Sequence, residues 1–395
     1  MQHRSDSQTG LTGQLLLLLA GLAALGSLAT NIILPAFPDM AADLGVSVKD
    51  LSATLASFFV AFAIGQLFVG PLSDRFGRKW PVLLGLVVFV AGSAACAFAN
   101  SLPQLIIGRI VQALGVCATS VLSRAIARDL YQGEALARAL SLIMVAMAAA
   151  PGFSPLLGGA LSSWLGWRST FGVVAFLAVL LGIYYLSRLG ETQGSDQRSP
   201  FSATGIVKTY AGLLTDRRFI APGMSVSLVI GSLYMFFSMA PAVLMTGFGF
   251  SPIGLSLFFA STVFVVFGAG FLAPKLARRW GPIRAARAGI WIGLTGSLAL
   301  LIGPQDVYCF SASITVFLLG MGLINPLGTA ITLQPFGQKA GAAASALLGF
   351  LQMGLAAVAI AIAAALPIPV YQAFGIVLVA NLSLSCLIFW RAAKP

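Results

Sequence analysis

The stretch Gly70-Pro-Leu-Ser-Asp-Arg-Phe-Gly-Arg-Lys79 places four charged side chains in a short turn between two long apolar segments. The apolar segments, 51–69 and 82–99, each approach the ~20 residues that a helix needs to cross a bilayer. Pro71 predicts the end of the incoming helix, because proline lacks a backbone N–H group. Gly77 can adopt the positive φ of a turn. The stretch therefore predicts a charged loop between two membrane-spanning helices.

The composition of the whole chain extends this prediction. Of the 395 residues, 58% are hydrophobic and 9% are charged, and the mean hydropathy is +0.96. A soluble domain of this length could not bury so much apolar surface. The apolar segments have helical length and lack the alternation of barrel strands, which favours a helical bundle over an outer-membrane barrel. We expect an all-α membrane protein.

The cysteines give no indication of a metal or a disulfide framework. Cys96, Cys117, Cys309 and Cys386 all lie in apolar segments without metal-ligand spacing, a pattern typical of free, buried thiols. No pairing of a nucleophile with a base is evident in the sequence. We therefore expect neither an enzyme nor a protein that binds a metal or a cofactor.

The basic residues indicate an orientation. The net charge is +12, which by itself is typical of nucleic-acid-binding proteins. Nearly all Lys and Arg residues, however, fall in alternate loops between the apolar segments; the exceptions are Lys49, Arg168 and, inside a segment, Arg109. This is the positive-inside pattern of membrane proteins. It predicts that both termini are cytoplasmic, and it argues against nucleic acid as a partner.

Twelve apolar segments divide the chain into two sets of six. We expect four regions, which are a cytoplasmic N-terminal tail (1–10), a first six-helix bundle (11–188), a cytoplasmic linker (189–217) and a second six-helix bundle (218–391).

Two motifs indicate that the bundles are repeats. Segment 45–52 is echoed by 249–256, and segment 70–79 by 270–279, at offsets of 204 and 200 residues. Two six-helix repeats predict a transporter whose binding site lies near the midplane of the membrane, between the halves.

The loop 70–79 resembles the signature G-x-L-x-D-R-x-G-R-K between spans 2 and 3 of the major facilitator superfamily. The resemblance implies a major facilitator fold and a conformational latch formed by Gly70, Asp74, Arg75, Gly77, Arg78 and Lys79. We expect Asp74 to pair with Arg75 or Arg78 and to face a helix N-terminus of the second half, near Gly341. The alternative is a charged loop that only fixes topology.

An arginine lies inside the fourth segment, in Gly108-Arg-Ile-Val-Gln-Ala-Leu-Gly115. A charge within a span is costly and by default functional. Arg109 and Gln112 share one helix face, and the run resembles the superfamily's span-4 signature R-x-x-Q-G-x-G, with Ala113 replacing the first glycine. We expect both side chains to bind substrate. The alternative is a structural arginine that ties this helix to a neighbouring carbonyl or polar side chain.

The fifth segment carries Ala150-Pro-Gly-Phe-Ser-Pro-Leu-Leu-Gly-Gly159, which resembles the antiporter signature G-P-x-x-G-G with Ser154 in place of a glycine. The resemblance implies drug/proton exchange and export. Kinking and close helix packing by prolines and glycines is the alternative. The motif residues are Pro151, Ser154, Pro155, Gly158 and Gly159.

The first and eleventh segments, at 30–38 and 340–352, resemble the Bcr/CflA group of twelve-span drug-resistance exporters, which includes bicyclomycin and chloramphenicol efflux proteins. The resemblance implies a bacterial cytoplasmic (inner) membrane protein. One departure concerns Asn31, where that group usually has an Asp that carries protons. Coupling is then expected to have moved to Asp39 or Asp129, unless transport runs on the substrate gradient alone or on exchange.

Polar and aromatic faces outline a candidate cavity, because spans 1, 4, 7 and 10 line the path in this superfamily. Besides Arg109 and Gln112, the expected substrate-binding residues are Asn31, Phe58, Phe62, Tyr234, Phe237, Ser238, Asn325 and Thr329. Ordinary helix packing is the alternative for each of them.

The function that we expect is the export of amphipathic, drug-like small molecules by alternating access, with protons as the coupling ion. The alternative is the uptake or exchange of a small, possibly anionic metabolite held by Arg109. The expected partners are a small-molecule substrate and the lipid bilayer, and the expected state is a monomer.

Overall fold

The computed structural model describes residues 13–194, 203–336 and 338–392. Within these residues the chain is helical, and twelve helices are long and apolar enough to cross a membrane. The first half consists of α1 (Gly13–Asn31), η1 (Leu34–Ala36), α2 (Phe37–Leu44), α3 (Ser52–Phe76), α4 (Lys79–Ala97), α5 (Leu102–Leu130), α6 (Gly133–Leu165) and α7 (Arg168–Arg188). The second half consists of α9 (Arg217–Ala240), η3 (Pro241–Gly247), α10 (Pro252–Trp280), α11 (Pro282–Ile302), α12 (Val307–Leu333), α13 (Gln338–Ala365) and α14 (Val370–Ala392).

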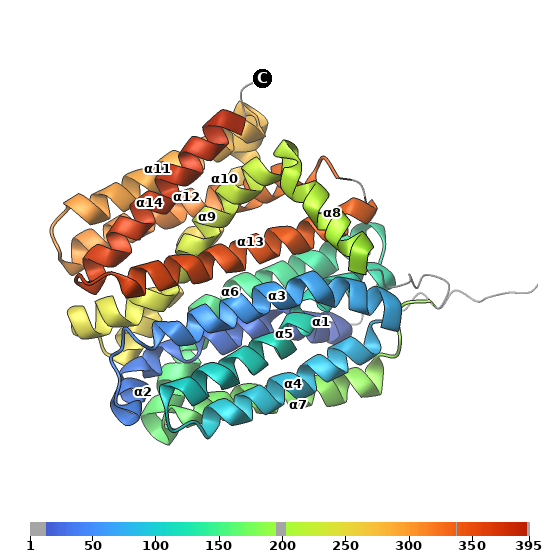
Figure 1. The fold of residues 1–395 in the computed structure, drawn as a ribbon, viewed down its shortest axis with the longest axis horizontal. Coiled ribbons are helices and arrows are strands. Elements are labelled where there is room, and N and C mark those ends of the chain that lie inside the picture. Colours follow the sequence, from blue (N-terminus) through green and yellow to red (C-terminus); the bar gives the residue numbers. More distant parts are fainter. Residues whose placement is uncertain (1–12, 195–202, 337, 393–395) are drawn as a thin grey trace, which may run out of the picture.

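The two halves lie side by side, the first in blue and green and the second in yellow to red in Figure 1. They meet where α3 packs along α13 and α6 packs along α10. The end of the bundle that carries the α3–α4 loop and residues 189–194 is called the linker end below. The opposite end, which carries α2 and η3, is called the far end.

Glycines set the tightest helix pair in each half. A Cβ atom added at Gly85 of α4 would come within 2.6 Å of the carbonyl oxygen of Gly115 in α5. A Cβ atom added at Gly289 of α11 would come within 2.8 Å of the carbonyl oxygen of Gly320 in α12. Small residues allow such backbone approach in membrane helices. The two crossings lie 204 to 205 residues apart in sequence, so the internal repeat seen in the sequence is also present in the packing of the helices.

Two details differ from the sequence prediction. Pro71 does not end the incoming helix, since α3 continues to Phe76 and ends at Gly77, whose φ is +85°. A proline inside a membrane helix costs one hydrogen bond, and packing by neighbouring helices tolerates that loss. The linker also contains a helix, α8 (Ala203–Thr215), and the Tyr210 hydroxyl of α8 donates to the Leu67 carbonyl of α3 at 3.0 Å.

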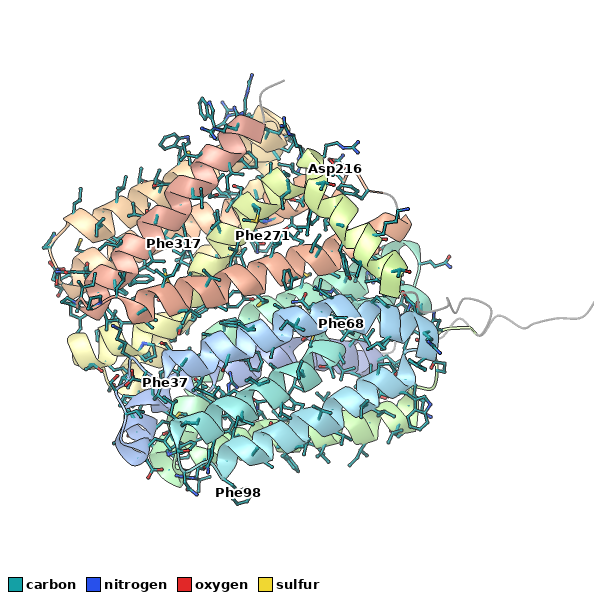
Figure 2. All side chains as sticks on the ribbon, viewed as in Figure 1. Phe37, Phe68, Phe98, Asp216, Phe271 and Phe317 are labelled. Atoms are coloured by element: carbon teal, nitrogen blue, oxygen red, sulfur yellow. The ribbon has the colours of Figure 1, made fainter. Side chains whose placement is uncertain are left out.

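The outer surface agrees with a membrane setting. Phe98 is 81% exposed and projects away from the bundle (Figure 2), and Phe271 is 76% exposed, whereas Phe37 and Phe317 are buried. Large apolar side chains remain exposed on most of the twelve helices. In water this surface would be costly, but in a bilayer the lipid tails cover it.

Candidate functional site

A cavity of about 320 Å³ lies between the halves. Its walls come from α1, α3, α5 and α6 of the first half and from α9, α10, α12 and α13 of the second. It reaches toward the linker end, because Leu333, the last residue of α12, lines it. At the far end the halves are joined by hydrogen bonds, from Lys49 Nζ to the Leu366 carbonyl at 2.9 Å and from Ser256 Oγ to the Pro155 carbonyl at 2.9 Å.

One wall of the cavity is aromatic. Phe58 and Phe62 stack with ring centroids 6.1 Å apart on α3. Phe59 of the same helix contacts Tyr234 of α9 with ring centroids 4.8 Å apart, so this contact joins the two halves. Phe237, one turn along α9 from Tyr234, also lines the cavity. Such rings supply large apolar contacts at low cost in conformational entropy.

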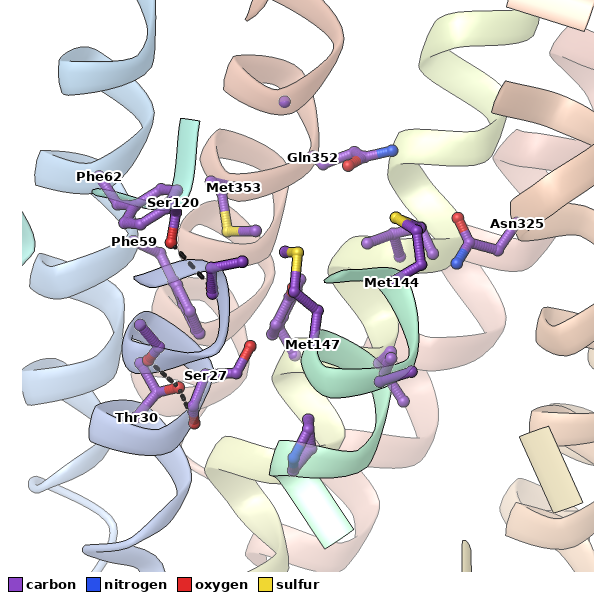
Figure 3. Close-up of a pocket in the computed structure, with 18 of the residues that line it drawn as sticks. Ser27, Thr30, Phe59, Phe62, Ser120, Met144, Met147, Asn325, Gln352 and Met353 are labelled. Atoms are coloured by element: carbon purple, nitrogen blue, oxygen red, sulfur yellow. Dashed lines mark hydrogen bonds between the residues drawn. The ribbon is translucent and has the colours of Figure 1, made fainter. Parts of the chain in front are cut away.

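Methionine side chains also line the cavity. Met144 and Met147 project from α6, and Met353 projects from α13, toward the same space (Figure 3). Met321 of α12 completes this group. Unbranched, polarisable thioethers adapt to ligands of different shape, and methionine is frequent on surfaces that bind many partners.

Some hydroxyl groups of the cavity are already hydrogen-bonded to backbone carbonyls, whereas other polar side chains are free to bind a ligand. The Thr30 hydroxyl donates to the Gly26 carbonyl at 3.0 Å, and the Ser120 hydroxyl donates to the Ala23 carbonyl at 3.1 Å. The side-chain amides of Gln66, Asn325 and Gln352 have no hydrogen-bond partner among the described residues. A cavity with apolar walls and a few convergent polar groups is the usual form of a small-molecule site.

The sequence-predicted binding residues separate into two groups. Phe58, Phe62, Tyr234, Phe237, Asn325 and Thr329 line the cavity. Asn31, Arg109, Gln112 and Ser238 are buried outside its lining. Asn31 donates to the Ser27 carbonyl at 2.7 Å and to the Thr30 hydroxyl at 3.1 Å, both within its own helix. Direct substrate contact by the second group would need another conformation and stays a prediction.

Arg109 is fully buried behind the aromatic wall. Its Nη1 donates to the Ala29 carbonyl of α1 at 3.1 Å and to the Gln112 side-chain oxygen. Gln112 in turn donates to Ser93 Oγ of α4 at 2.8 Å. The guanidinium lies 4.3 Å from the centroid of the Phe58 ring, which faces the cavity. These contacts match the structural alternative, since Arg109 ties α5 to α1 and α4 and supports Phe58 from behind.

The antiporter-like motif lies on the part of α6 that contacts α1 of its own half and α10 of the other half. Pro151 lines the cavity. A Cβ atom added at Gly158 would overlap the Ile32 carbonyl, so only glycine fits against α1 there. Pro155 accepts the hydrogen bond from Ser256 of α10, and Gly159 lies against the same serine. Ser154 is buried, and its hydroxyl has no hydrogen-bond partner in the part of the chain that the structure describes.

The predicted latch residues form an ionic network at the linker end. Arg78 pairs with Asp74 at 2.8 Å and with Asp129 of α5 at 3.0 Å. Burial alone would lower the pKa of Arg78, but the hydrogen bonds and charges of these carboxylates raise it. Gly70 has no neighbour within 4 Å of an added Cβ, and Arg75 and Lys79 lie over the rings of Phe76 and Trp80, respectively. Asp74 thus pairs with one of its two expected partners, and its contact near Gly341 stays a prediction.

A carboxylate that the sequence reasoning missed completes this network. Glu191 accepts from the backbone N–H of Arg78 at 2.7 Å and of Lys79 at 3.3 Å, at the N-terminus of α4. Burial favours protonation of Glu191, but the backbone N–H donors outweigh it and lower the pKa of the carboxyl. The φ of +85° at Gly77 explains a glycine at this position, and an added Cβ there would also displace the Glu191 carboxylate. The start of the linker is therefore bound to the latch loop.

The two proton-coupling candidates lie outside the cavity. Asp39 is exposed in α2 and accepts from Ser162 Oγ of α6 at 3.0 Å. Asp129 accepts from Arg78 and, at 3.2 Å, from Thr192 Oγ1. The sequence reasoning also missed Gln66, Arg124 and Gln352 as lining residues. Arg124 lies six residues before the end of α5, and its neighbours Arg128 and Asp129 gave that stretch the pattern of a charged loop.

Two bundles of six spanning helices around a central cavity define a transporter of the major facilitator type. The family model described as Major Facilitator Superfamily matches residues 19–361, and the chain belongs to this superfamily. Its relatives place it in the Bcr/CflA group. It is 32% identical over 337 residues to "Chloramphenicol resistance protein" of Pseudomonas aeruginosa, covering 82% of this chain and 76% of that one. It is 28% identical over 351 residues to "Bicyclomycin resistance protein homolog" of Haemophilus influenzae, covering 87% of each.

A solved structure shows the same fold. The crystal structure of the nucleoside transporter NupG superposes with a TM-score of 0.77 over 98% of this chain and 100% of that chain, at 14% identity. The chain is therefore a multi-pass membrane transporter of this superfamily with drug-resistance relatives.

Proposed function

We propose that this protein exports amphipathic, drug-like small molecules from the bacterial cytoplasm across the inner membrane. The observation that carries the proposal is the cavity between the halves, with aromatic and methionine walls and three free side-chain amides. Apolar walls bind varied hydrophobic ligands, and a few amides orient their polar groups. The names of the drug-resistance relatives support the same function.

Transport would proceed by alternating access. In the present conformation the cavity reaches toward the linker end, while Lys49–Leu366 and Ser256–Pro155 hydrogen bonds hold the far end together. Opening to the far side requires these contacts to break and contacts at the linker end to form. The described partners of Arg78 all lie in the first half or at the start of the linker, so a contact of Asp74 with the second half near Gly341 would form only when the linker end closes.

The linker end would face the cytoplasm, with both termini on that side, because it carries the basic loops. Single cysteines at Thr215 and Gln305, both exposed, test this orientation in a background without the four native cysteines. An impermeant thiol reagent should label Gln305→Cys in intact cells and Thr215→Cys only after lysis. Labelling of Thr215→Cys in intact cells would reverse the orientation.

Proton coupling would use Asp39 rather than an acid inside the bundle. Asp129 is held by Arg78, whereas Asp39 is exposed and bonded to the hydroxyl of Ser162 on α6, the helix of the antiporter-like motif. Proteoliposomes with an imposed pH gradient test this coupling. Substrate flux should respond to the gradient in the wild type and in Asp129→Asn, and should lose that response in Asp39→Asn. A response unchanged in Asp39→Asn would refute this role.

Each transporter would work as a monomer, because its cavity is built from one chain.

Susceptibility testing examines export itself. A drug-sensitive bacterial host that lacks its own exporters should gain resistance to chloramphenicol or to other amphipathic drugs when it expresses the chain. The matched control is Gly349→Leu, whose side chain would fill the cavity beside Gln66 and should therefore abolish the gained resistance.

The second candidate function, uptake or exchange of a small anionic metabolite, is favoured by the absence of Asp and Glu from the lining residues. Unchanged or lowered resistance across the panel, with accumulation of a labelled metabolite, would support that function and exclude export.

A further inference from the structure

We propose that Arg124 is the binding residue for an anionic group of the substrate, so that the cavity selects amphipathic acids over lipophilic cations. This inference rests on the proposed function in one respect, namely that the cavity is the transport site. It adds a charge preference that the apolar walls do not supply.

Arg124 belongs to the face of α5 that borders the cavity. Ser120, Val121 and Arg124 line it together, which is the i, i+1, i+4 spacing of one helix face. The corresponding face of the second half comes from α12. Gly92 packs against the backbone of Gln112 in α5, and Gly296 packs against the backbone of Phe317 in α12. Because these two contacts are equivalent, residues of α5 correspond to residues of α12 at an offset of 205.

By this offset Ser120 corresponds to Asn325 and Arg124 to Thr329, and all four residues line the cavity. The repeat thus places two equivalent positions across the cavity from each other. One of them has become a cation, whereas its counterpart has stayed a neutral hydroxyl. The fold tolerates a hydroxyl at this position, so helix packing alone does not call for a charge there.

Within residues 13–194, 203–336 and 338–392, the charge of Arg124 has no counter-ion. Among the described residues no hydrogen bond, ion pair or aromatic ring contact involves its guanidinium. It is the one charged residue among those that line the cavity. The carboxylates at the linker end are already engaged, since Asp74 and Asp129 both pair with Arg78. An unpaired charge in a half-buried position is costly, and an anionic ligand would relieve that cost.

The other internal arginine does not compete for the ligand. Arg109 is fully buried behind Phe58 and is bound to the Ala29 carbonyl and to Gln112. Its positive charge nevertheless adds to that of Arg124, and no lining carboxylate opposes the two. The field in the cavity is therefore positive, which attracts anions and disfavours cations.

Two neutral amides extend the site beyond the guanidinium. Gln66 of α3 is 6% exposed and lines the cavity, and its amide lies against Gly349 of α13, where a Cβ atom would overlap it. Gln352, one turn further along α13, also lines the cavity. A planar carboxylate matches the donor fork of Arg124, and the amides can bind further polar atoms of the same molecule.

Binding to the purified full chain in lipid nanodiscs tests the inference. The probes are three amphipathic carboxylates (nalidixic acid, fusidic acid and ibuprofen), the uncharged primary amide of each, and the cation tetraphenylphosphonium. In at least one pair the wild type should bind the carboxylate about tenfold more tightly than its amide, the size expected for a charge-assisted contact. Tetraphenylphosphonium should bind more weakly than that carboxylate.

Variants of two arginines on the same helix distinguish a specific contact from general charge. Arg124→Gln should abolish the preference for the carboxylate while leaving the affinity for the amide unchanged, and Arg124→Lys should retain part of the preference. Arg128→Gln is the matched control, because Arg128 is exposed one turn further along α5 and does not line the cavity. It should bind like the wild type.

The outcomes separate this inference from the proposed function. A preference that survives in Arg124→Gln, or no preference for the carboxylate in any of the three pairs, would overturn the role of Arg124 even if the chain confers resistance to chloramphenicol. A preference lost in Arg124→Gln would support it even if no resistance is observed, in which case export fails and the anionic site stands.

Discussion

In the first half α4 and α5 cross where Gly92 meets the backbone of Gln112, and in the second half α11 and α12 cross where Gly296 meets the backbone of Phe317. The backbones correspond, but the side chains differ. Gln112 belongs to a buried polar network with Arg109 and Ser93, whereas Phe317 is buried among apolar side chains. The comparison teaches that glycine crossings build the scaffold twice, while a fully buried charged side chain, Arg109, occurs only in the first half among the described residues.

The loops at the linker end repeat this contrast. The first copy holds Asp74 and Arg78 in an ionic network, and Glu191 caps the N-terminus of α4. The second copy has Pro274 where the first has Asp74, and α11 begins at Pro282 without a side-chain cap. The loop of the first half is thus fixed by polar contacts, whereas the uncharged lining of the cavity comes from both halves, with 14 residues from the first and 17 from the second.

Removing the buried arginine should break the comparison most severely. Arg109→Ala removes the group that ties α5 to α1 and orients Gln112, and we expect it to abolish transport while part of the protein still folds. Its counterpart at the offset of 205 is Ile314, which is also buried. Ile314→Ala should cost ~2–5 kcal/mol of stability but retain transport per folded molecule. Transport at the wild-type level in Arg109→Ala would show that the polar network is dispensable.

The glycine crossings should respond equally in both halves, which would sharpen the comparison. Gly92→Ala and Gly296→Ala each force a Cβ into backbone atoms of the neighbouring helix, and each should destabilise the protein by ~1–3 kcal/mol. Gly172→Ala and Gly268→Ala are the controls, because nothing lies within 4 Å of a Cβ at either position. Thermal unfolding in detergent measures all four. A loss confined to one half would mean that the two crossings are not equivalent.

The latch carboxylate should affect motion more than binding. Asp74→Asn weakens one of the two ion pairs of Arg78, an interaction worth ~0.2–1 kcal/mol at such a partly exposed site. We expect a several-fold lower transport rate with ligand affinity unchanged, measured by flux and by equilibrium binding in parallel. Because the second copy lacks the acid, Pro274→Ala should leave the rate near that of the wild type. Loss of binding with a normal rate of conformational exchange would contradict the latch.

The cap of α4 should give the smallest effect, visible through pH. The lowered pKa of Glu191 means that its stabilising contribution is present above its unfolded pKa of ~4.3 and is lost as the pH falls through the folded value. Glu191→Gln should therefore melt earlier than the wild type at pH 7, and the two curves should converge below pH ~4. Glu134→Gln is the control, since Glu134 is exposed and pairs only with Arg138. A difference that grows in acid would refute the cap.

The candidate site shows where sequence reasoning was informative. Helical spacing predicted that Tyr234, Ser238, Asn325 and Thr329 face a common cavity. Of these, Tyr234, Asn325 and Thr329 line the cavity, whereas Ser238 is buried outside its lining, and the spacing could not distinguish the two outcomes. Which side of a buried helix faces a cavity depends on the rotation of that helix against all its neighbours.

The sequence by itself determined the class of the protein. Twelve apolar segments of helical length, basic loops on alternate sides and the 70–79 signature were sufficient for a twelve-helix major facilitator transporter in two repeats, because the bilayer permits few other arrangements of such segments. Only the tertiary structure decided which polar groups meet. It buried Arg109 behind Phe58, left Arg124 unpaired at the cavity, and brought Glu191 to the start of α4. Each of these arrangements depends on residues that lie on different helices or far apart in the chain, and a local sequence pattern carries no information about such neighbours.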